Sequence, residues 1–363
     1  MAEIVLGIGT SHSPMLNQPA DIWPEHAKFD LKSRELAFPP SGNVLSYETA
    51  LERADPAVAT LIKQERFDEQ HARCQAAIAK LAESMKAANP DVVVIISDDQ
   101  DELFFEDNMP MFSVYWGDTV RTYKRNPPET APIASRSAAW GFGDDLEIPV
   151  RSDLGRHIVD HMVQNDFDVS HFTYFKEQYG GKVVRRYPTE DGETDHARET
   201  QPRRMGLPHG YGFVVKRIME NNPIPLVPIF QNTCYPPNQP TPRRCYAFGK
   251  EIAKAIASWE PADGSAKPLR VAVVASGGLS HFTVDEEMDL MVLNGLEKND
   301  AETLQSIPRN RLHSAASEAL NWVTLGGVMS DTNLPHERLD YLPVYRTPAA
   351  TGGGWAFVQW TEK

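Results

Sequence analysis

Runs of consecutive apolar, β-branched residues recur along the chain and predict buried strands. Three are clear, at residues 4–8, 92–96 and 271–275. Continuous apolar character, rather than alternation, is typical of strands that are covered on both faces. Segments of helical period lie between them, at residues 73–88 and 244–259. The pattern predicts an α/β fold in which a central mixed β-sheet is covered by helices.

Other stretches are less regular. Residues 225–230 (Pro-Leu-Val-Pro-Ile-Phe) predict a further strand, and their two prolines, which cannot donate to a ladder, favour a sheet edge or the strand ends. Residues 15–47 and 108–147 have no clear period, and the charged residues 185–204 are expected to be exposed. Such stretches are commonly surface excursions or lids. We therefore expect a single domain over residues 1–363 with long loop insertions.

Composition narrows the class of protein. The chain has 36 basic and 50 acidic residues, a balance that repels polyphosphate and argues against nucleic-acid binding. Its three cysteines are too few for a disulfide framework and form no C-x-x-C pair. There is no apolar run near ~18 residues and no basic leader. We expect a cytoplasmic protein that does not bind membranes.

Candidate chemistry gathers where the predicted strands end. His12 follows the first strand in Gly-Thr-Ser-His, at the kind of strand end where open α/β sheets bind ligands. Residues 97–102 (Ser-Asp-Asp-Gln-Asp-Glu) follow the second, and such massed carboxylates need a cation or hydrogen-bond donors. Residues 276–289 follow the third and run from paired glycines to several acids. The alternatives are a histidine that merely closes a turn and a solvated acidic turn.

Three further segments offer acid–base or anion-binding groups. His209 lies in Gly-Leu-Pro-His-Gly-Tyr-Gly, a loop that can press a ring onto a ligand, and His157 lies near the start of a predicted helix. A proline-rich loop leads to a helix that we expect to begin at Pro242. Arg243 and Arg244 follow it and can receive an anionic group or pair with nearby acids.

Jointly these segments resemble the type II (class III) extradiol ring-cleavage dioxygenases, typified by the β-subunit of protocatechuate 4,5-dioxygenase. The matching segments contain, in order, Gly9–His12, Leu154–Ile158, Pro208–Gly210, Asn232–Thr233, Arg244–Gly249, Ser276–His281, Glu287–Asp289 and Leu320–Trp322. The resemblance implies Fe(II) held by His12, by a histidine after the second strand and by Glu287. It also implies that His209 is the general acid or base and that His157 assists it.

The sequence departs from the family pattern at one ligand. Where the family usually has Asn-Asp-His, this chain has Asp98-Asp99-Gln100, so the expected histidine falls on Gln100. An amide is a weaker donor to Fe(II) than imidazole, so we expect lower affinity or a preference for another divalent metal. Three arrangements stay open: Gln100 binds directly or through water, a neighbouring acid (Asp98, Asp99 or Glu102) replaces it, or a distant histidine (His26 or His71) does.

The hypothesis is a dioxygenase that binds a small aromatic substrate and O₂. We expect five residues to contact a ring of protocatechuate, gallate or O-methylgallate type: Tyr211, Asn232, Thr233, Arg243 and His281. Residues 15–47 are expected either to cover the active site, in place of the small partner subunit of some family members, or to form a contact in a homodimer or larger homo-oligomer.

Two other functions stay open. One is a metal-dependent hydrolase or lyase in which Asp98, Asp99 and Glu287 bind a hard cation. The other is a non-catalytic ligand-binding protein on the same scaffold. The oxygenase hypothesis depends on His12 and Glu287 sharing a single cation.

Overall fold

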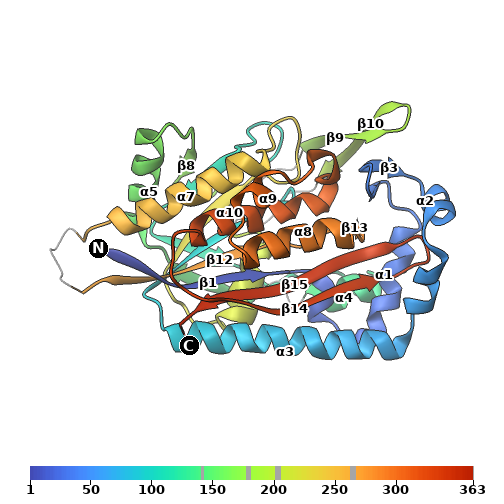
Figure 1. Ribbon diagram of the computed structural model, residues 1–363, viewed down its shortest axis with the longest axis horizontal. Coiled ribbons are helices and arrows are strands. Elements are labelled where there is room, and N and C mark those ends of the chain that lie inside the picture. The colour runs from blue at the N-terminus through green and yellow to red at the C-terminus, as the bar shows by residue number, and fades with distance from the viewer. Residues whose placement is uncertain (140–142, 177–180, 201–205, 262–266, 363) are drawn as a thin grey trace.

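The centre of the molecule is a mixed β-sheet. The computed structural model describes residues 1–139, 143–176, 181–200, 206–261 and 267–362, and within them the sheet has nine strands (Figure 1). Their order is β13-β15-β1-β12-β4-β11-β5-β8, with β14 paired to β15. The strands are β1 (Ala2–Thr10), β4 (Val92–Ser97), β5 (Phe112–Tyr115), β8 (Ser170–Phe172), β11 (Leu226–Gln231), β12 (Leu269–Ser276), β13 (His281–Thr283), β14 (His336–Tyr345) and β15 (Thr351–Thr361).

Four neighbouring strands, β1, β12, β4 and β11, run parallel and form the middle of the sheet. The three apolar runs of the sequence are β1, β4 and β12, and the side chains of residues 92–96 are fully buried. The predicted α/β class, with a mixed sheet covered by helices, is confirmed. Because parallel strands end at the same edge, the residues that follow β1, β12 and β4 are brought together.

The strand β11 does not lie at the sheet edge, which is one of the two positions that its prolines favoured in the sequence. It lies between β4 and β5, inside the sheet. Pro228 is tolerated there because the pairing with β5 begins only at Ile229, while the partner of Pro228 on the other side is Ile95 of β4. Pro225 lies just before the strand, as its missing N–H favours.

Helices cover both faces of the sheet, as Figure 1 shows. The first face packs against α5 (Ser152–Gln164), α7 (Pro242–Ser258), α8 (Glu286–Glu297), α9 (Ala301–Gln305) and α10 (Ala319–Met329). The second packs against α3 (Gln64–Ala88), α6 (His209–Phe213) and η5 (Val214–Ile218). None of the described helices is both long enough and apolar enough to cross a membrane.

Both predicted helices are present, and the first begins earlier than expected. The first extends nine residues further toward the N-terminus than the periodic segment 73–88, because its first turns are largely exposed and carry few apolar residues. The second begins at Pro242, as expected, and the Thr241 side chain caps it by accepting a hydrogen bond from the Arg244 N–H at 3.2 Å.

The stretches 15–47, 108–147 and 185–204 contain helices and strands that the sequence pattern did not predict. Residues 15–47 include η1 (Pro14–Asn17), η2 (Ala20–Ile22), α1 (Trp23–Asp30), β2 (Leu36–Phe38) and β3 (Asn43–Leu45). Residues 108–147 include β5, β6 (Thr119–Thr122), α4 (Ile133–Ala139) and β7 (Leu146–Pro149). The charged stretch 185–204 is mostly a hairpin of β9 (Gly181–Thr189) and β10 (Gly192–Thr200); its last four residues lie outside the described ones. The elements named in the first two stretches have only three to eight residues, which are too few to establish a period.

The close packing of α7 on α10 yields a prediction about stability. A Cβ at Gly327 would lie 2.1 Å from the backbone oxygen of Tyr246, whereas one at Gly326 would meet the ends of two side chains, Leu304 at 2.7 Å and Leu296 at 2.8 Å. We expect Gly327→Ala to lower the free energy of unfolding by about 2 kcal/mol or more, and the matched Gly326→Ala to cost clearly less. Urea unfolding of both variants measures this, and equal midpoints would contradict the packing.

Candidate functional site

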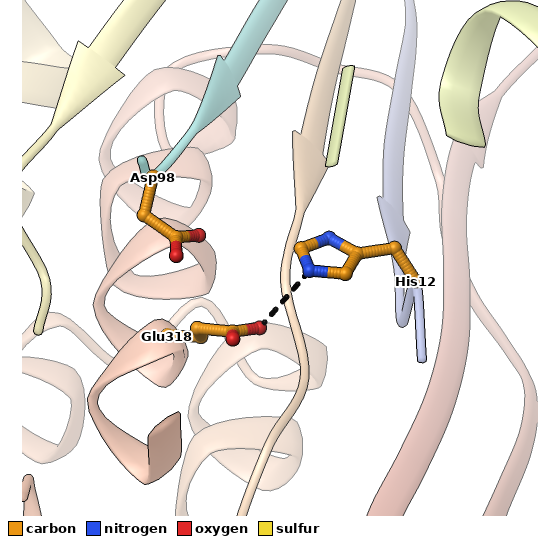
Figure 2. A group of neighbouring side chains, drawn as sticks. All are labelled: His12, Asp98 and Glu318. Atoms are coloured by element: carbon orange, nitrogen blue, oxygen red, sulfur yellow. Dashed lines mark ion pairs between the residues drawn. The ribbon is translucent and has the colours of Figure 1, made fainter. Parts of the chain in front are cut away.

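Three buried side chains meet at the edge where the parallel strands end. His12 follows β1, Asp98 follows β4, and Glu318 ends η7 (Ser314–Glu318), directly before α10 (Figure 2). One ligand atom from each lies within 4.8 Å of the others, and all three residues are at most 3% exposed. The register explains this convergence, because Thr10 of β1 pairs with Ser276 of β12, and Ala275 of β12 pairs with Ile96 of β4.

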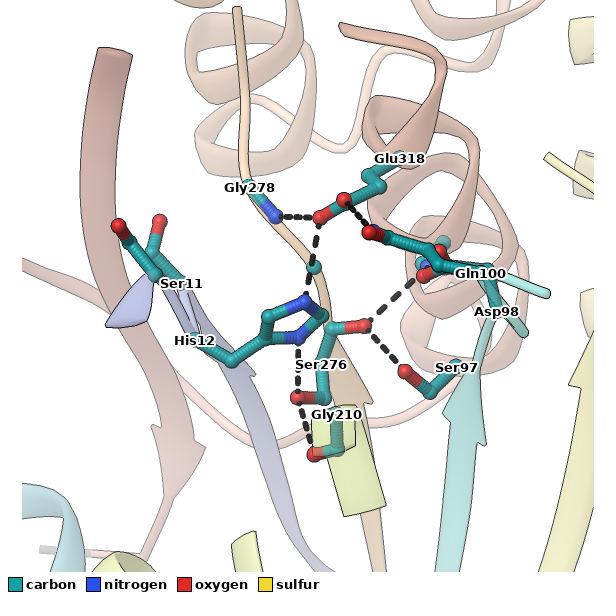
Figure 3. Close-up of polar contacts among 12 residues, drawn as sticks. Ser11, His12, Ser97, Asp98, Gln100, Gly210, Ser276, Gly278 and Glu318 are labelled. Carbon is teal, nitrogen blue, oxygen red and sulfur yellow. Dashed lines mark hydrogen bonds and ion pairs between the residues drawn. The ribbon is translucent and has the colours of Figure 1, made fainter. Parts of the chain in front are cut away.

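Hydrogen bonds determine which nitrogen of His12 carries its proton. The Ser276 hydroxyl donates to the Gly210 carbonyl at 2.8 Å, so its oxygen accepts from His12 Nδ1 at 3.0 Å (Figure 3). Burial lowers the pKa of His12 to about 4, which keeps the ring neutral near pH 7. The lone pair of Nε2 therefore faces Glu318 Oε2 across 3.5 Å. Two acceptors that face each other in a buried site repel unless a proton or a metal ion lies between them.

The two carboxylates are held close together by donors. Gln100 Nε2 donates to Asp98 Oδ2 at 3.2 Å and also to Glu318 Oε1 (Figure 3). Asn321 of α10 donates to Asp98 Oδ1 at 3.0 Å. Burial and the charge of Glu318 raise the pKa of Asp98 well above its usual range. Burial opposes ionisation of Glu318 too, but the charge and hydrogen bond of His281 and the hydrogen bond from the Gly278 N–H outweigh it and lower the pKa of Glu318.

This donor set fits a divalent metal ion. One imidazole nitrogen and two carboxylates form an incomplete coordination sphere of the kind that leaves positions for substrate and water. The cation would also remove the repulsion that raises the pKa of Asp98. Gln100 lies at this site as a hydrogen-bond donor to both carboxylates, with its amide nitrogen toward them.

Two of the three side chains, those of His12 and Glu318, border a cavity of about 360 Å³, whose wall also includes Gln100. Four histidines contribute to its wall: His12, His26, His209 and His281. Apolar surface comes from Met15, Phe29, Phe282 and Trp355, and charged groups come from Asp30, Glu102, Arg125, Glu318 and Arg346. A concave, partly apolar space with converging polar groups is typical of a small-molecule site.

The stretch 15–47 forms one wall of this cavity and is fastened to the sheet. Asp30, at the end of α1, accepts two hydrogen bonds from Arg346, at 2.8 and 2.9 Å, and a third from Thr351 at 2.7 Å. Trp23 is fully buried and packs edge-on against Trp355, with ring centroids 5.0 Å apart. A buried ion pair and a buried aromatic pair thus fix α1 over the strand ends.

His209 faces the same cavity and is held by a buried carboxylate. Its Nδ1 donates to Glu102, and Arg125 donates to the other oxygen of that carboxylate. The His209 ring meets the His12 ring edge-on, with centroids 4.8 Å apart. Burial opposes the ionisation of Glu102, but the hydrogen bonds from His209 and the charge of Arg125 outweigh it and lower the pKa of Glu102 far below its usual range.

The expected substrate-contacting residues are divided. His281 lines the cavity, donates from Nδ1 to the Leu279 carbonyl at 2.9 Å, and directs Nε2 to Glu318 at 3.2 Å. Tyr211 is fully buried, and its hydroxyl lies within hydrogen-bond distance of two backbone carbonyls, those of Ser97 and Ile229. Asn232 bonds the backbone of Tyr235, Thr233 contacts Cys234, and Arg243 is exposed on α7. These four are not among the residues that line the cavity.

The structure does not bring Glu287 to His12, so these two residues do not share the single cation on which the sequence hypothesis depended. His157 is not brought to His12 either. Glu287 lies in the first turn of α8, its side chain is 80% exposed, and it pairs with Arg311 at 2.8 Å. His157 lies on α5 and bonds Ser258 of α7 at 3.1 Å. The carboxylate beside His12 is Glu318 instead, because α8 begins only after β13 has carried the chain past the strand ends.

Glu318 is the residue that the sequence interpretation missed, although two signals pointed to it. It is the only acid between Glu302 and Asp331, and it lies two residues before Leu320-Asn321-Trp322, part of the resemblance. All eleven residues of α10 after it are buried. An acid at the start of a helix with no polar face cannot be a solvated surface group. Asp98 was one of the open alternatives for the missing ligand.

The chain is similar to a known protein family and to individual known proteins. Residues 56–352 match the family described as the catalytic LigB subunit of aromatic ring-opening dioxygenase. Gallate dioxygenase of Pseudomonas putida KT2440 is 26% identical over 232 residues, which cover 60% of this chain and 53% of that protein. The chain thus spans about half the length of this curated relative. An uncharacterized protein from Escherichia coli K12, JW3007, aligns over 98% of this chain and 99% of its own, with 11% identity and a TM-score of 0.43.

Proposed function

Because this chain belongs to the LigB family of aromatic ring-opening dioxygenases, we propose that it is a non-haem Fe(II) extradiol dioxygenase acting on a catecholic acid of protocatechuate, gallate or O-methylgallate type. The observation that carries the proposal is the convergence of His12 with the buried carboxylates of Asp98 and Glu318, next to a cavity that His209 also lines. A general acid or base beside a metal-binding group is what ring opening of a diol requires.

In this proposal His12, Asp98 and Glu318 hold the metal, and Glu318 takes the role that the resemblance gave to Glu287. Bound Fe(II) supplies electron transfer between the ring diol and dioxygen, both of whose atoms enter the product. Gln100 keeps the two carboxylates at a fixed separation. The Ser276–Gly210 chain keeps the His12 lone pair on Nε2.

The other cavity residues bind and deprotonate the substrate. His209 takes a proton from a ring hydroxyl on one side, and the ring of His281 forms part of the wall on another. Met15, Phe29 and Trp355 supply apolar contact for the ring and exclude water. The guanidinium groups of Arg125 and Arg346 also line the cavity, where each is paired with a carboxylate, and they are the candidate hydrogen-bond donors to an acidic ring substituent.

Two broader properties belong to the same proposal. The three cysteines are free and buried, which suits a reducing, cytoplasmic location. Phe29 is 45% exposed on α1 and lies beside the cavity, where a second copy of the chain in a homo-oligomer would cover it.

Oxygen consumption tests the reaction. After anaerobic loading with Fe(II), we expect the protein to consume one O₂ per catecholic acid and to form a yellow ring-opened product, with loss of activity in His209→Gln. A Clark electrode and absorbance spectra follow both. Absence of uptake with all dihydroxylated rings at full metal occupancy would exclude the oxygenase and favour a hydrolase or a binding protein.

The identity of the carboxylate ligand is tested by a matched pair of variants. Glu318→Gln is expected to weaken binding of Fe(II) or Co(II) more than about a hundred-fold, because loss of an outer-shell partner alone costs roughly 10- to 100-fold. The exposed Glu287→Gln should bind like the unaltered protein. Anaerobic titration with Co(II), followed by its visible absorption, measures both. The reverse order of effects would restore Glu287 as the ligand.

Gln100→His tests the departure from the family pattern. An imidazole between Asp98 and Glu318 should raise affinity for Fe(II) on the order of ten-fold relative to Mg(II), because nitrogen donors suit the softer ion. Gln64→His, at an exposed position on α3, is the control and should change neither affinity. Unchanged selectivity in Gln100→His would mean that residue 100 does not face the metal.

A further inference from the structure

Glu102 connects a guanidinium group, which can only donate hydrogen bonds, with an imidazole ring, which can donate or accept them. One carboxylate oxygen accepts from His209 Nδ1 and, more weakly at 3.3 Å, from the His209 backbone N–H. The other accepts from Arg125. The Glu102 side chain is 4% exposed, that of His209 11%, and that of Arg125 30%. The arrangement is therefore a largely buried line of arginine, carboxylate and imidazole that ends at the cavity.

From this line we infer that Glu102, oriented by Arg125, is a positioning residue that fixes which nitrogen of His209 carries the proton. A carboxylate can only accept, so the proton of the neutral ring must sit on Nδ1. The lone pair then lies on Nε2, the nitrogen through which the ring can take a proton from a bound hydroxyl. The inference rests on the proposed function only where it says what His209 does to a substrate.

The local backbone is built to hold Glu102 in place. Asp99 accepts hydrogen bonds from the N–H groups of Glu102, Leu103 and Phe104, the last two at 2.8 and 2.9 Å. The loop that leaves β4 is thereby folded around the Asp99 side chain, which turns Glu102 toward α6. Asp99 itself is not among the cavity-lining residues, so the loop separates a structural acid from a positioning acid.

Arg125 makes the effect of a conservative change directional. In Glu102→Gln the amide must place its oxygen toward the guanidinium, which has only donors, and its NH₂ toward His209. The opposite orientation would set an NH₂ against a cation, a larger cost than the loss of the weak backbone contact. The NH₂ group would then donate to Nδ1 and move the ring proton to Nε2. Glu102→Gln should therefore invert the tautomer and not merely loosen the ring.

The test reads the tautomer directly in full-length protein labelled with ¹⁵N-histidine, with the His209 signals assigned by their loss in His209→Gln. We expect Nδ1–H in the unaltered protein, Nε2–H in Glu102→Gln, and Nδ1–H again in Glu102→Asp. The double variant Glu102→Gln/Arg125→Leu should recover Nδ1–H in part, because the amide is free to turn. An unchanged tautomer in Glu102→Gln, or no recovery in the double variant, would overturn the inference.

Kinetics separate this inference from the proposed function. In Fe(II)-loaded protein Glu102→Gln should lower kcat roughly 10²- to 10⁴-fold with little change in KM or metal content, and Glu102→Asp should restore much of it. If Glu102→Gln lost metal in proportion to its loss of kcat, Glu102 would act on the metal site, and this result would contradict the inference. If the unaltered protein opens no ring, the proposed function fails, while the tautomer measurement still decides the role of Glu102.

Discussion

The parallel register of β1, β12 and β4 is the constraint on which the site depends. It brings the residues after three strands to one level, so His12 and Asp98 face each other although 86 positions separate them. Glu318 completes the group from the start of a buried helix on the first face of the sheet. Without a cation, the fold must tolerate two carboxylates and a lone pair in one buried space, at a cost in electrostatic free energy.

The acids after β4 have different environments and therefore different tasks. Asp98 lies beside Glu318 and belongs to the proposed metal site, Asp99 folds the loop, and Glu102 holds His209. Burial and the neighbouring Glu102 charge raise the pKa of Asp99 to about 8, whereas His209 and Arg125 lower that of Glu102. One run of acidic residues thus yields a ligand, a structural hydrogen-bond acceptor and an orienting group, because each side chain has a different partner.

The sequence was informative where burial produces a continuous pattern. It predicted β1, β4 and β12, the end of each, and therefore the place of His12, because residues buried on both faces are uniformly apolar. It did not identify which glutamate lies beside His12, since Glu287 and Glu318 both lie near segments of the resemblance. Only long-range packing distinguishes the exposed Glu287 from the buried Glu318. Short elements in residues 15–47 escaped for the same reason. They are fixed by contacts such as Asp30 with Arg346, which span more than three hundred positions.

Gly210 joins the two halves of the site, and its lack of a side chain has a thermodynamic consequence. A Cβ there would lie 2.4 Å from Ser97 Oγ and 3.0 Å from the His12 ring, so only glycine lets the segment approach so closely. Its carbonyl sets the protonation of His12 through Ser276, and its chain neighbour is His209. Any shift of this segment therefore alters both the affinity for the proposed metal ion and the orientation of His209. By reciprocity, occupancy of the ion site must bias the segment toward its working geometry to the same degree.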